Sequence, residues 1–166
     1  EHGSVTDAGL AHHVMASRVP VLARLADQTE RAVKKAADAG AHALVVPHVR
    51  SRAAAENIVK WARYPPAGER SVGLSRNTLL GVGLADALQA TDLPVVIAQI
   101  EDVDGVANVD AICRVPGIDG VFIGPYDLSA ALGEPGKFDS TAFRDAVART
   151  VAAARAEGVT VGVFAP

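Results

Sequence analysis

Two acidic side chains in this sequence each follow an apolar run that is typical of a buried strand. Glu101 closes the run 93–100, and Asp127 comes three residues after Gly124, at the end of a second run. Carboxylates at the carboxyl ends of parallel strands lie where α/β proteins bind ligands and metals. Because hard divalent cations prefer oxygen ligands, we predict that Glu101 and Asp127 bind such a cation together. The alternative is that each carboxylate only caps the helix that follows it.

Two further polar side chains lie at or near predicted strand ends. Gln99 precedes Glu101 by two residues and therefore points to the same side of its strand. Its amide needs a partner, which is either a bound carboxylate or ketone, or a neighbouring strand. Arg24 ends an apolar run and is suited to bidentate capture of a substrate carboxylate. A surface salt bridge is the other interpretation of Arg24.

The turn that leads to Asp127 is a third candidate element. Gly124, Pro125 and Tyr126 enter a short predicted helix, and such a turn offers backbone N–H donors to a substrate carboxylate. A simple tight turn is the alternative. The turn is therefore predicted to contribute to substrate binding.

Histidines and one misplaced aspartate complete the set of candidates. His2 would follow a strand lost upstream and is a candidate, with a disordered terminus as the alternative, whereas His48, after another strand, is a weaker candidate. Asp38 lies near the carboxyl end of a predicted helix, where the helix dipole disfavours a negative charge. This placement predicts a partner for Asp38, either a histidine or an arginine.

Composition limits the classes of protein to which the chain can belong. Its 166 residues are 49% hydrophobic and carry a formal net charge of −3, so one globular domain is expected and nucleic acid is not a predicted partner. No apolar stretch reaches the roughly 18 residues that cross a bilayer. The single cysteine, Cys113, excludes an internal disulfide and fits the cytoplasm. Because the sequence lacks an initial Met and stops after a predicted strand, we expect a domain truncated at both ends.

Strands and helices alternate along the sequence, which predicts an α/β fold with a parallel sheet and right-handed crossovers. A complete eight-fold barrel needs about 250 residues, so 1–166 is predicted to be a partial TIM-type (β/α)8 barrel of about five to six βα units. An open doubly wound sheet is the alternative, but no nucleotide-binding glycine motif follows the first strand. The predicted strands are 19–24, 41–47, 93–100, 120–123 and 159–165. The predicted helices are 27–39, 51–63, 78–90 (interrupted by Gly81 and Gly83), 106–113 and 140–157.

Several of these segments together resemble the HpcH/HpaI family of class II, metal-dependent pyruvate aldolases. The resemblance rests on Glu1-His2-Gly3, Arg24, the stretch 63–70, Gln99-Ile100-Glu101 and the stretch 124–129. It implies a TIM-type barrel, a divalent cation (Mg²⁺, Mn²⁺ or Co²⁺) and a homo-oligomer, in the family a hexamer. It also implies retro-aldol cleavage of a 4-hydroxy-2-oxo acid to pyruvate, or a close 2-oxo acid, and an aldehyde, through an enolate held by the metal.

The same resemblance implies a role for each candidate residue. Metal binding falls to Glu101 and Asp127, and catalysis to His2, Arg24 and Asp38. Substrate binding falls to Arg24, Gln99, Gly124, Pro125 and Tyr126. Ser71 stands where the family usually has a glycine, so that loop is expected to differ.

Two other functions stay open at this point. An acyl-CoA lyase of the citrate lyase β type would use related chemistry, but it would need clustered basic residues for the CoA phosphates, which the sequence lacks. An inactive barrel fragment that only binds 2-oxo acids is the second alternative.

Overall fold

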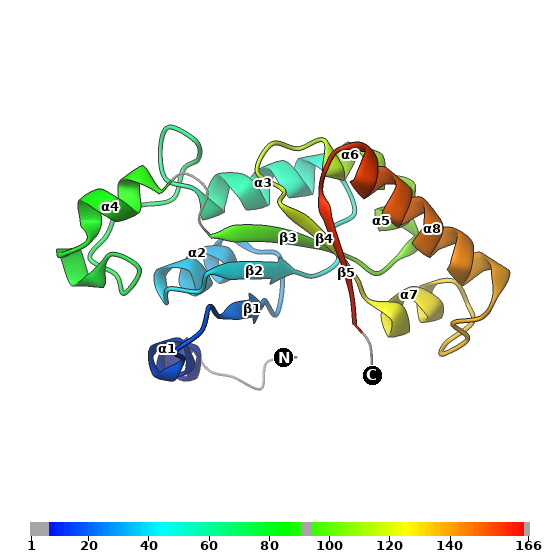
Figure 1. The fold of residues 1–166 in the computed structure, drawn as a ribbon, viewed down its shortest axis with the longest axis horizontal. Helices are drawn as coiled ribbons and strands as arrows, with labels where there is room; N and C mark the ends of the chain where they lie inside the picture. Colours follow the sequence, from blue (N-terminus) through cyan, green and yellow to red (C-terminus); the bar gives the residue numbers. More distant parts are fainter. Residues whose placement is uncertain (1–6, 91–93, 165–166) are drawn as a thin grey trace. The chain divides into compact units, whose positions relative to one another are not determined.

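The computed structural model describes residues 7–90 and 94–164 and has an α/β fold (Figure 1). Its parallel sheet has the strand order β1-β2-β3-β4-β5, which follows the order along the chain. A doubly wound sheet requires a reversal of strand order, whereas a barrel adds each strand next to the previous one. The prediction of a partial TIM-type barrel is therefore confirmed. The strands are β1 (Leu22–Arg24), β2 (Ala43–Val46), β3 (Val95–Ile100), β4 (Gly120–Ile123) and β5 (Thr160–Val163).

Helices separate the strands, as the alternating pattern predicted. Eight α-helices and one 3₁₀ helix occur among the described residues. They are α1 (Asp7–Ala16), α2 (Glu30–Asp38), α3 (Arg52–Ala62), η1 (Leu79–Gly81), α4 (Leu84–Gln89), α5 (Val103–Ala107), α6 (Val109–Cys113), α7 (Pro125–Ala131) and α8 (Thr141–Ala156). No helix in the described ranges is long and apolar enough to cross a membrane.

The chain divides into two compact units. The first unit comprises Glu1–Val46 and Asn57–Val96. In it, β1 pairs with β2 in parallel, so that Arg24 lies opposite Val45. Helix α2 packs on β2.

Helix α2 begins three residues later than the predicted helix 27–39. Thr29, and not Asp27, is the N-cap, because its hydroxyl accepts the backbone N–H of Ala32 at 3.3 Å. Asp27 instead accepts hydrogen bonds from the backbone N–H and the hydroxyl of Thr29. These bonds hold the pKa of Asp27 below its ordinary value.

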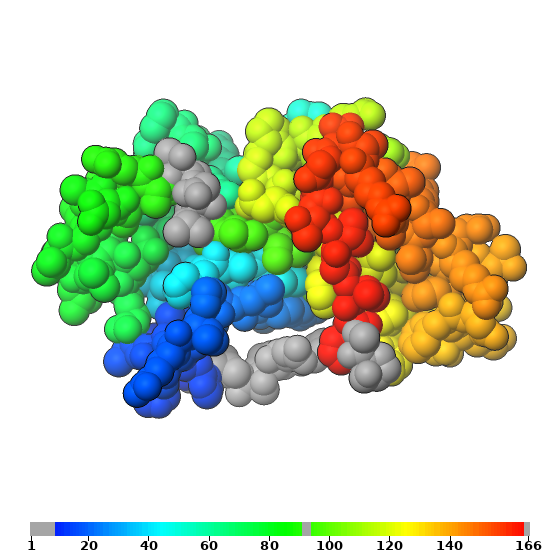
Figure 2. Space-filling model, viewed as in Figure 1, coloured from blue at the N-terminus to red at the C-terminus, as the bar shows by residue number. Residues whose placement is uncertain are grey.

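The second unit comprises Pro47–Glu56 and Ile97–Pro166. Here β4 pairs in parallel with both β3 and β5, and α8 packs against β4, β5 and α6. The atoms of α8 and β5, coloured orange and red, lie next to each other on the face shown in Figure 2. Ser140, the first residue of the predicted helix 140–157, is the N-cap of α8, since its hydroxyl accepts the backbone N–H of Phe143.

The predicted helix 106–113 is two short helices instead of one. The break lies at Asn108, between α5 and α6. The Asn108 side chain donates to the backbone oxygens of Arg50 and Asp104, at 2.8 and 3.0 Å. A side chain that bonds to the backbone in this way competes with a continuous helix, which explains the difference.

Candidate metal and substrate site

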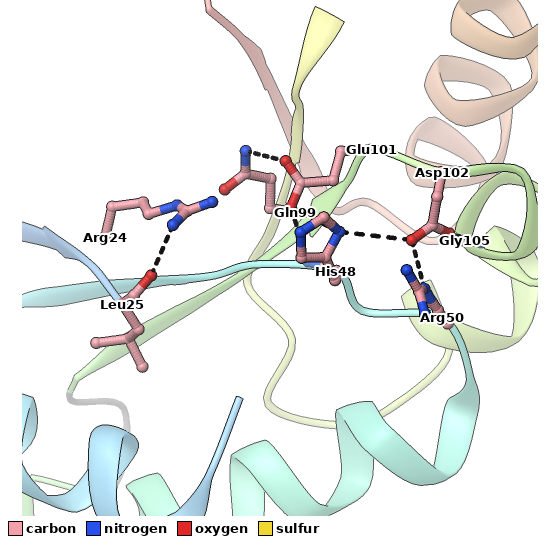
Figure 3. Close-up of polar contacts among 8 residues, drawn as sticks. All are labelled: Arg24, Leu25, His48, Arg50, Gln99, Glu101, Asp102 and Gly105. Carbon is pink, nitrogen blue, oxygen red and sulfur yellow. Dashed lines mark hydrogen bonds and ion pairs between the residues drawn. The ribbon is translucent and has the colours of Figure 1, made fainter. Parts of the chain in front are cut away.

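Glu101 is the buried centre of the candidate site. It follows β3 directly, and its side chain has no exposed surface. One carboxylate oxygen, Oε1, accepts the backbone N–H of His48 at 2.9 Å, and the other, Oε2, accepts Nε2 of Gln99 at 2.7 Å (Figure 3). A buried carboxylate is tolerated only when such donors replace water. Gln99 thus donates to Glu101 on its own strand segment. The sequence had suggested either a bound substrate or a neighbouring strand as its partner.

Gly124 lies directly against this carboxylate. It follows β4, the parallel neighbour of β3, and donates its N–H to the backbone oxygen of Ile100 at 3.2 Å. A Cβ atom at Gly124 would lie 2.7 Å from Oε2 of Glu101 and 2.9 Å from Nε2 of Gln99. Those distances are shorter than van der Waals contact, so any side chain here would force Glu101 or Gln99 to shift.

Asp127 lies in the first turn of α7, which Pro125 begins. Its side chain is exposed, and the helix dipole favours a negative charge at this end. Pro125 is buried, while Tyr126 is about half exposed, with its ring 5.1 Å from that of Phe138. The turn 124–127 therefore carries an exposed carboxylate three residues after a glycine that lies against a buried one.

Helix capping does not account for either carboxylate. The residue that caps α5 is Asp102, which accepts the backbone N–H of Gly105 at 2.8 Å, and Glu101 is not involved. The N-cap of α7 is Gly124, and no side chain caps that helix. The simpler interpretation of Glu101 and Asp127 as caps is thus wrong.

Three charged or polar side chains next to Glu101 extend the site. Nδ1 of His48 lies 3.3 Å from Oε1 of Glu101 and 3.6 Å from Oδ2 of Asp102. Arg50 contacts the same oxygen of Asp102 through Nε at 2.5 Å, and this bond raises the pKa of Arg50 (Figure 3). The sequence favoured His48 only weakly and did not indicate Arg50 or Asp102. Their positions in the sequence could have indicated them, because all three lie within four residues after a predicted strand.

The remaining predicted residues belong to the first unit or lie outside the described residues. Arg24 ends β1 as predicted, is half-buried, and donates from Nη1 to the backbone oxygen of Leu25 at 3.0 Å. Asp38 has an arginine partner, since Nε and Nη2 of Arg70 lie 3.1 and 2.6 Å from its Oδ1. His2 lies outside the described residues.

Comparison with known proteins identifies the family. The profile of the HpcH/HpaI aldolase/citrate lyase family matches residues 5–166. The chain belongs to this family.

Relatives in the HpcH/HpaI family agree with this assignment. A hydroxypyruvate/pyruvate aldolase of Pseudomonas aeruginosa is 44% identical over 134 residues, covering 76% of this chain and 50% of that protein. A 2-keto-3-deoxy-L-rhamnonate aldolase of Salmonella gallinarum is 35% identical over 171 residues, covering 99% and 64%. The crystal structure of a family protein from Burkholderia cenocepacia superposes with a TM-score of 0.89 at 33% identity, covering 99% of this chain and 68% of that one. The chain thus spans between one half and two thirds of the length of these curated relatives.

The donor set of this HpcH/HpaI site fits a hard divalent cation. Carboxylate oxygens are the preferred ligands of Mg²⁺ and related ions, and at position 124 a glycine avoids the close contact that a Cβ atom would make with Oε2 of Glu101. In the described parts of the chain, no group of three or more His, Cys, Asp or Glu side chains is arranged to hold a metal. A cation held by the Glu101 and Asp127 pair would leave its other coordination positions to water and substrate.

Proposed function

We propose that this chain carries the active site of a carbon–carbon lyase of the class II aldolase type. Its substrate would be a 4-hydroxy-2-oxo acid, and its products pyruvate, or a close 2-oxo acid, and an aldehyde. The observation that carries the proposal is the carboxylate of Glu101. It is buried at the exit of a parallel strand, is not used for capping, and touches a glycine three residues before a second carboxylate.

A divalent cation, when bound, would supply Lewis-acid stabilisation of the negative charge that develops on the 2-oxo acid. Glu101 and Asp127 would hold that cation. Gln99 would orient Glu101 through its amide, which already donates to Oε2. A second contact of this kind fixes the direction of a metal ligand and tunes its basicity.

The roles of the other residues come from the resemblance to the family. His2 would accept the proton of the 4-hydroxyl as the C3–C4 bond breaks and the aldehyde leaves. The electron pair of that bond passes to the pyruvate fragment as an enolate, which is then protonated at C3. Arg24 would bind the carboxylate of the oxo acid, and Asp38 would orient His2. The backbone of Gly124, Pro125 and Tyr126 would contact the same carboxylate.

The proposal also includes the identity of the cation and the assembly. Mg²⁺, Mn²⁺ and Co²⁺ all suit oxygen ligands, and the site would accept any of them. The family resemblance supports a homo-oligomer and a cytoplasmic enzyme that acts on small molecules.

Pyruvate release tests the proposed function directly. The chain would be incubated with a 4-hydroxy-2-oxo acid, and pyruvate would be followed through a coupled lactate dehydrogenase assay. We expect turnover with Mn²⁺ or Mg²⁺ that stops when EDTA removes the cation. The same assay with malyl-CoA tests the acyl-CoA lyase alternative. Turnover of malyl-CoA without turnover of the 4-hydroxy-2-oxo acid would contradict our proposal. Calorimetry with Mn²⁺ and oxalate separates the inactive fragment, for which binding occurs without turnover.

A further inference from the structure

The loop Pro47–Arg50 is attached to the end of β3 by backbone and side-chain contacts. The backbone N–H of Val49 donates to the backbone oxygen of Gln99 at 3.2 Å. One residue further on, the backbone oxygen of Arg50 accepts Nδ2 of Asn108 at 2.8 Å. Between Pro47 and Val49, His48 donates its own N–H to Glu101. The loop therefore lies against the segment that carries the candidate metal ligand.

His48 adopts a backbone conformation that is unfavourable for most residues other than glycine. Its φ angle is 51°, in the left-handed region. That region is uncommon for residues other than glycine and worst for β-branched ones, although histidine is among the residues enriched there. Backbone strain of this kind is concentrated at functional sites, where surrounding contacts hold it in place. At His48 the contact is with a fully buried carboxylate.

We propose that His48 is a positioning residue for Glu101, acting through its left-handed backbone. This inference rests on the proposed function. The backbone N–H lies 2.9 Å from Oε1 of Glu101, whereas the ring nitrogen Nδ1 lies 3.3 Å away and the side chain is 46% exposed. The N–H is thus the closer contact, and it exists only while the loop keeps its conformation. Contacts behind a metal ligand fix its orientation, and their loss weakens metal binding.

Substitutions that differ in left-handed propensity separate the backbone from the ring. His48→Gly removes the ring but adopts the left-handed conformation without cost. We expect its dissociation constant for Mn²⁺ to stay close to that of the wild type. His48→Val disfavours this conformation, so we expect that constant to rise about 10–100-fold. His48→Ala, with a smaller conformational penalty, should fall between them and provides a second variant if His48→Val folds poorly.

A matched control imposes the same backbone strain elsewhere in the second unit. Gly158 has φ +69°, and a Cβ atom there would meet nothing within 4 Å. Gly158 precedes β5 in the chain, whereas Glu101 follows the carboxyl end of β3. Gly158→Val should therefore lower the midpoint of thermal unfolding and leave Mn²⁺ affinity unchanged.

The full chain of each variant would be titrated with Mn²⁺ by calorimetry or by electron paramagnetic resonance of the free ion. Thermal unfolding in EDTA would be measured in parallel. Equal affinity of His48→Val and the wild type would overturn the inference, as would a loss in His48→Gly as large as that in His48→Val. Either result leaves the proposed function standing, because the wild type still binds the ion. Absence of Mn²⁺ binding by the wild type would overturn both.

Discussion

His48 and Glu101 are separated by 53 positions in the sequence, yet the backbone N–H of His48 lies 2.9 Å from Oε1 of Glu101. This bond joins the loop after β2 to the end of β3 inside one compact unit. The orientation of the buried carboxylate therefore depends on two chain segments at once. Substitutions in either segment should therefore weaken metal binding even where the protein still folds.

Gly124→Ala should impair metal binding. The new methyl group would lie 2.7 Å from Oε2 of Glu101, so the carboxylate must move. We expect the dissociation constant for Mn²⁺ to rise about 10–100-fold, as for lost support of a metal ligand. Gly73→Ala is the matched control, because a Cβ atom there meets nothing within 4 Å. Unchanged Mn²⁺ affinity in Gly124→Ala would contradict the described packing.

Asp127→Asn should weaken metal binding and leave the stability of the fold nearly unchanged. The side chain is exposed, so we expect a change in unfolding free energy within about 0.5 kcal/mol. Mn²⁺ affinity and lyase turnover should both fall by at least about tenfold, since one of two charged ligands is lost. Asp104→Asn, an exposed aspartate in the first turn of α5, should change neither quantity. If both variants bind Mn²⁺ equally well, Asp127 is not a ligand.

Arg24→Ala should slow turnover on the order of 10²-fold or more, by analogy with the loss of a preorganised donor. The measurement is steady-state pyruvate release, with kcat and KM determined separately. Arg31→Ala, an exposed position in α2, serves as the control and should behave as wild type. Unaltered cleavage in Arg24→Ala would remove this residue from the mechanism.

Asp38→Ala should destabilise the first unit. It leaves the Arg70 guanidinium, whose side chain is only 1% exposed, without its carboxylate partner. A cation–π contact would remain, because Cζ of Arg70 lies 4.5 Å from the centroid of the Tyr64 ring. Loss of a hydrogen bond to a charged group costs about 1.5–3 kcal/mol, which urea unfolding would measure. Adding Arg70→Met should recover part of the loss, and a purely additive double variant would argue against the pairing.

Cys113 should make stability depend on alkaline pH. Burial raises the pKa of its thiol from 9.0 to about 11. The neutral thiol is therefore favoured in the folded state. Its contribution to the free energy of unfolding is fully present below pH 9 and is lost as the pH rises towards 11. Thiol alkylation at pH 8 should be slow in the native protein and fast in guanidinium chloride. Cys113→Ala should reduce the loss of unfolding free energy between pH 9 and 11, and an unaltered pH dependence would contradict this role.

The sequence alone determined the class of fold and the principal carboxylate. Apolar runs broken by polar, glycine-rich segments predicted the strands, because burial on both faces leaves a continuous hydrophobic pattern. The run 120–123 has the bounds of β4, and Glu101 was placed correctly at the end of β3. These features are local, so a linear pattern records them.

Only the tertiary structure decided what touches Glu101. The donor His48, the close approach of Gly124 and the Arg50–Asp102 pair involve segments that follow three different strands, β2, β3 and β4. Their proximity follows from strand pairing and from the conformation of one left-handed residue. The same reason explains the break of the predicted helix 106–113 at Asn108, where a side chain bonds to a loop 58 residues away. Contacts between distant segments leave no periodic signal in a single sequence, so they become visible only once the chain has folded.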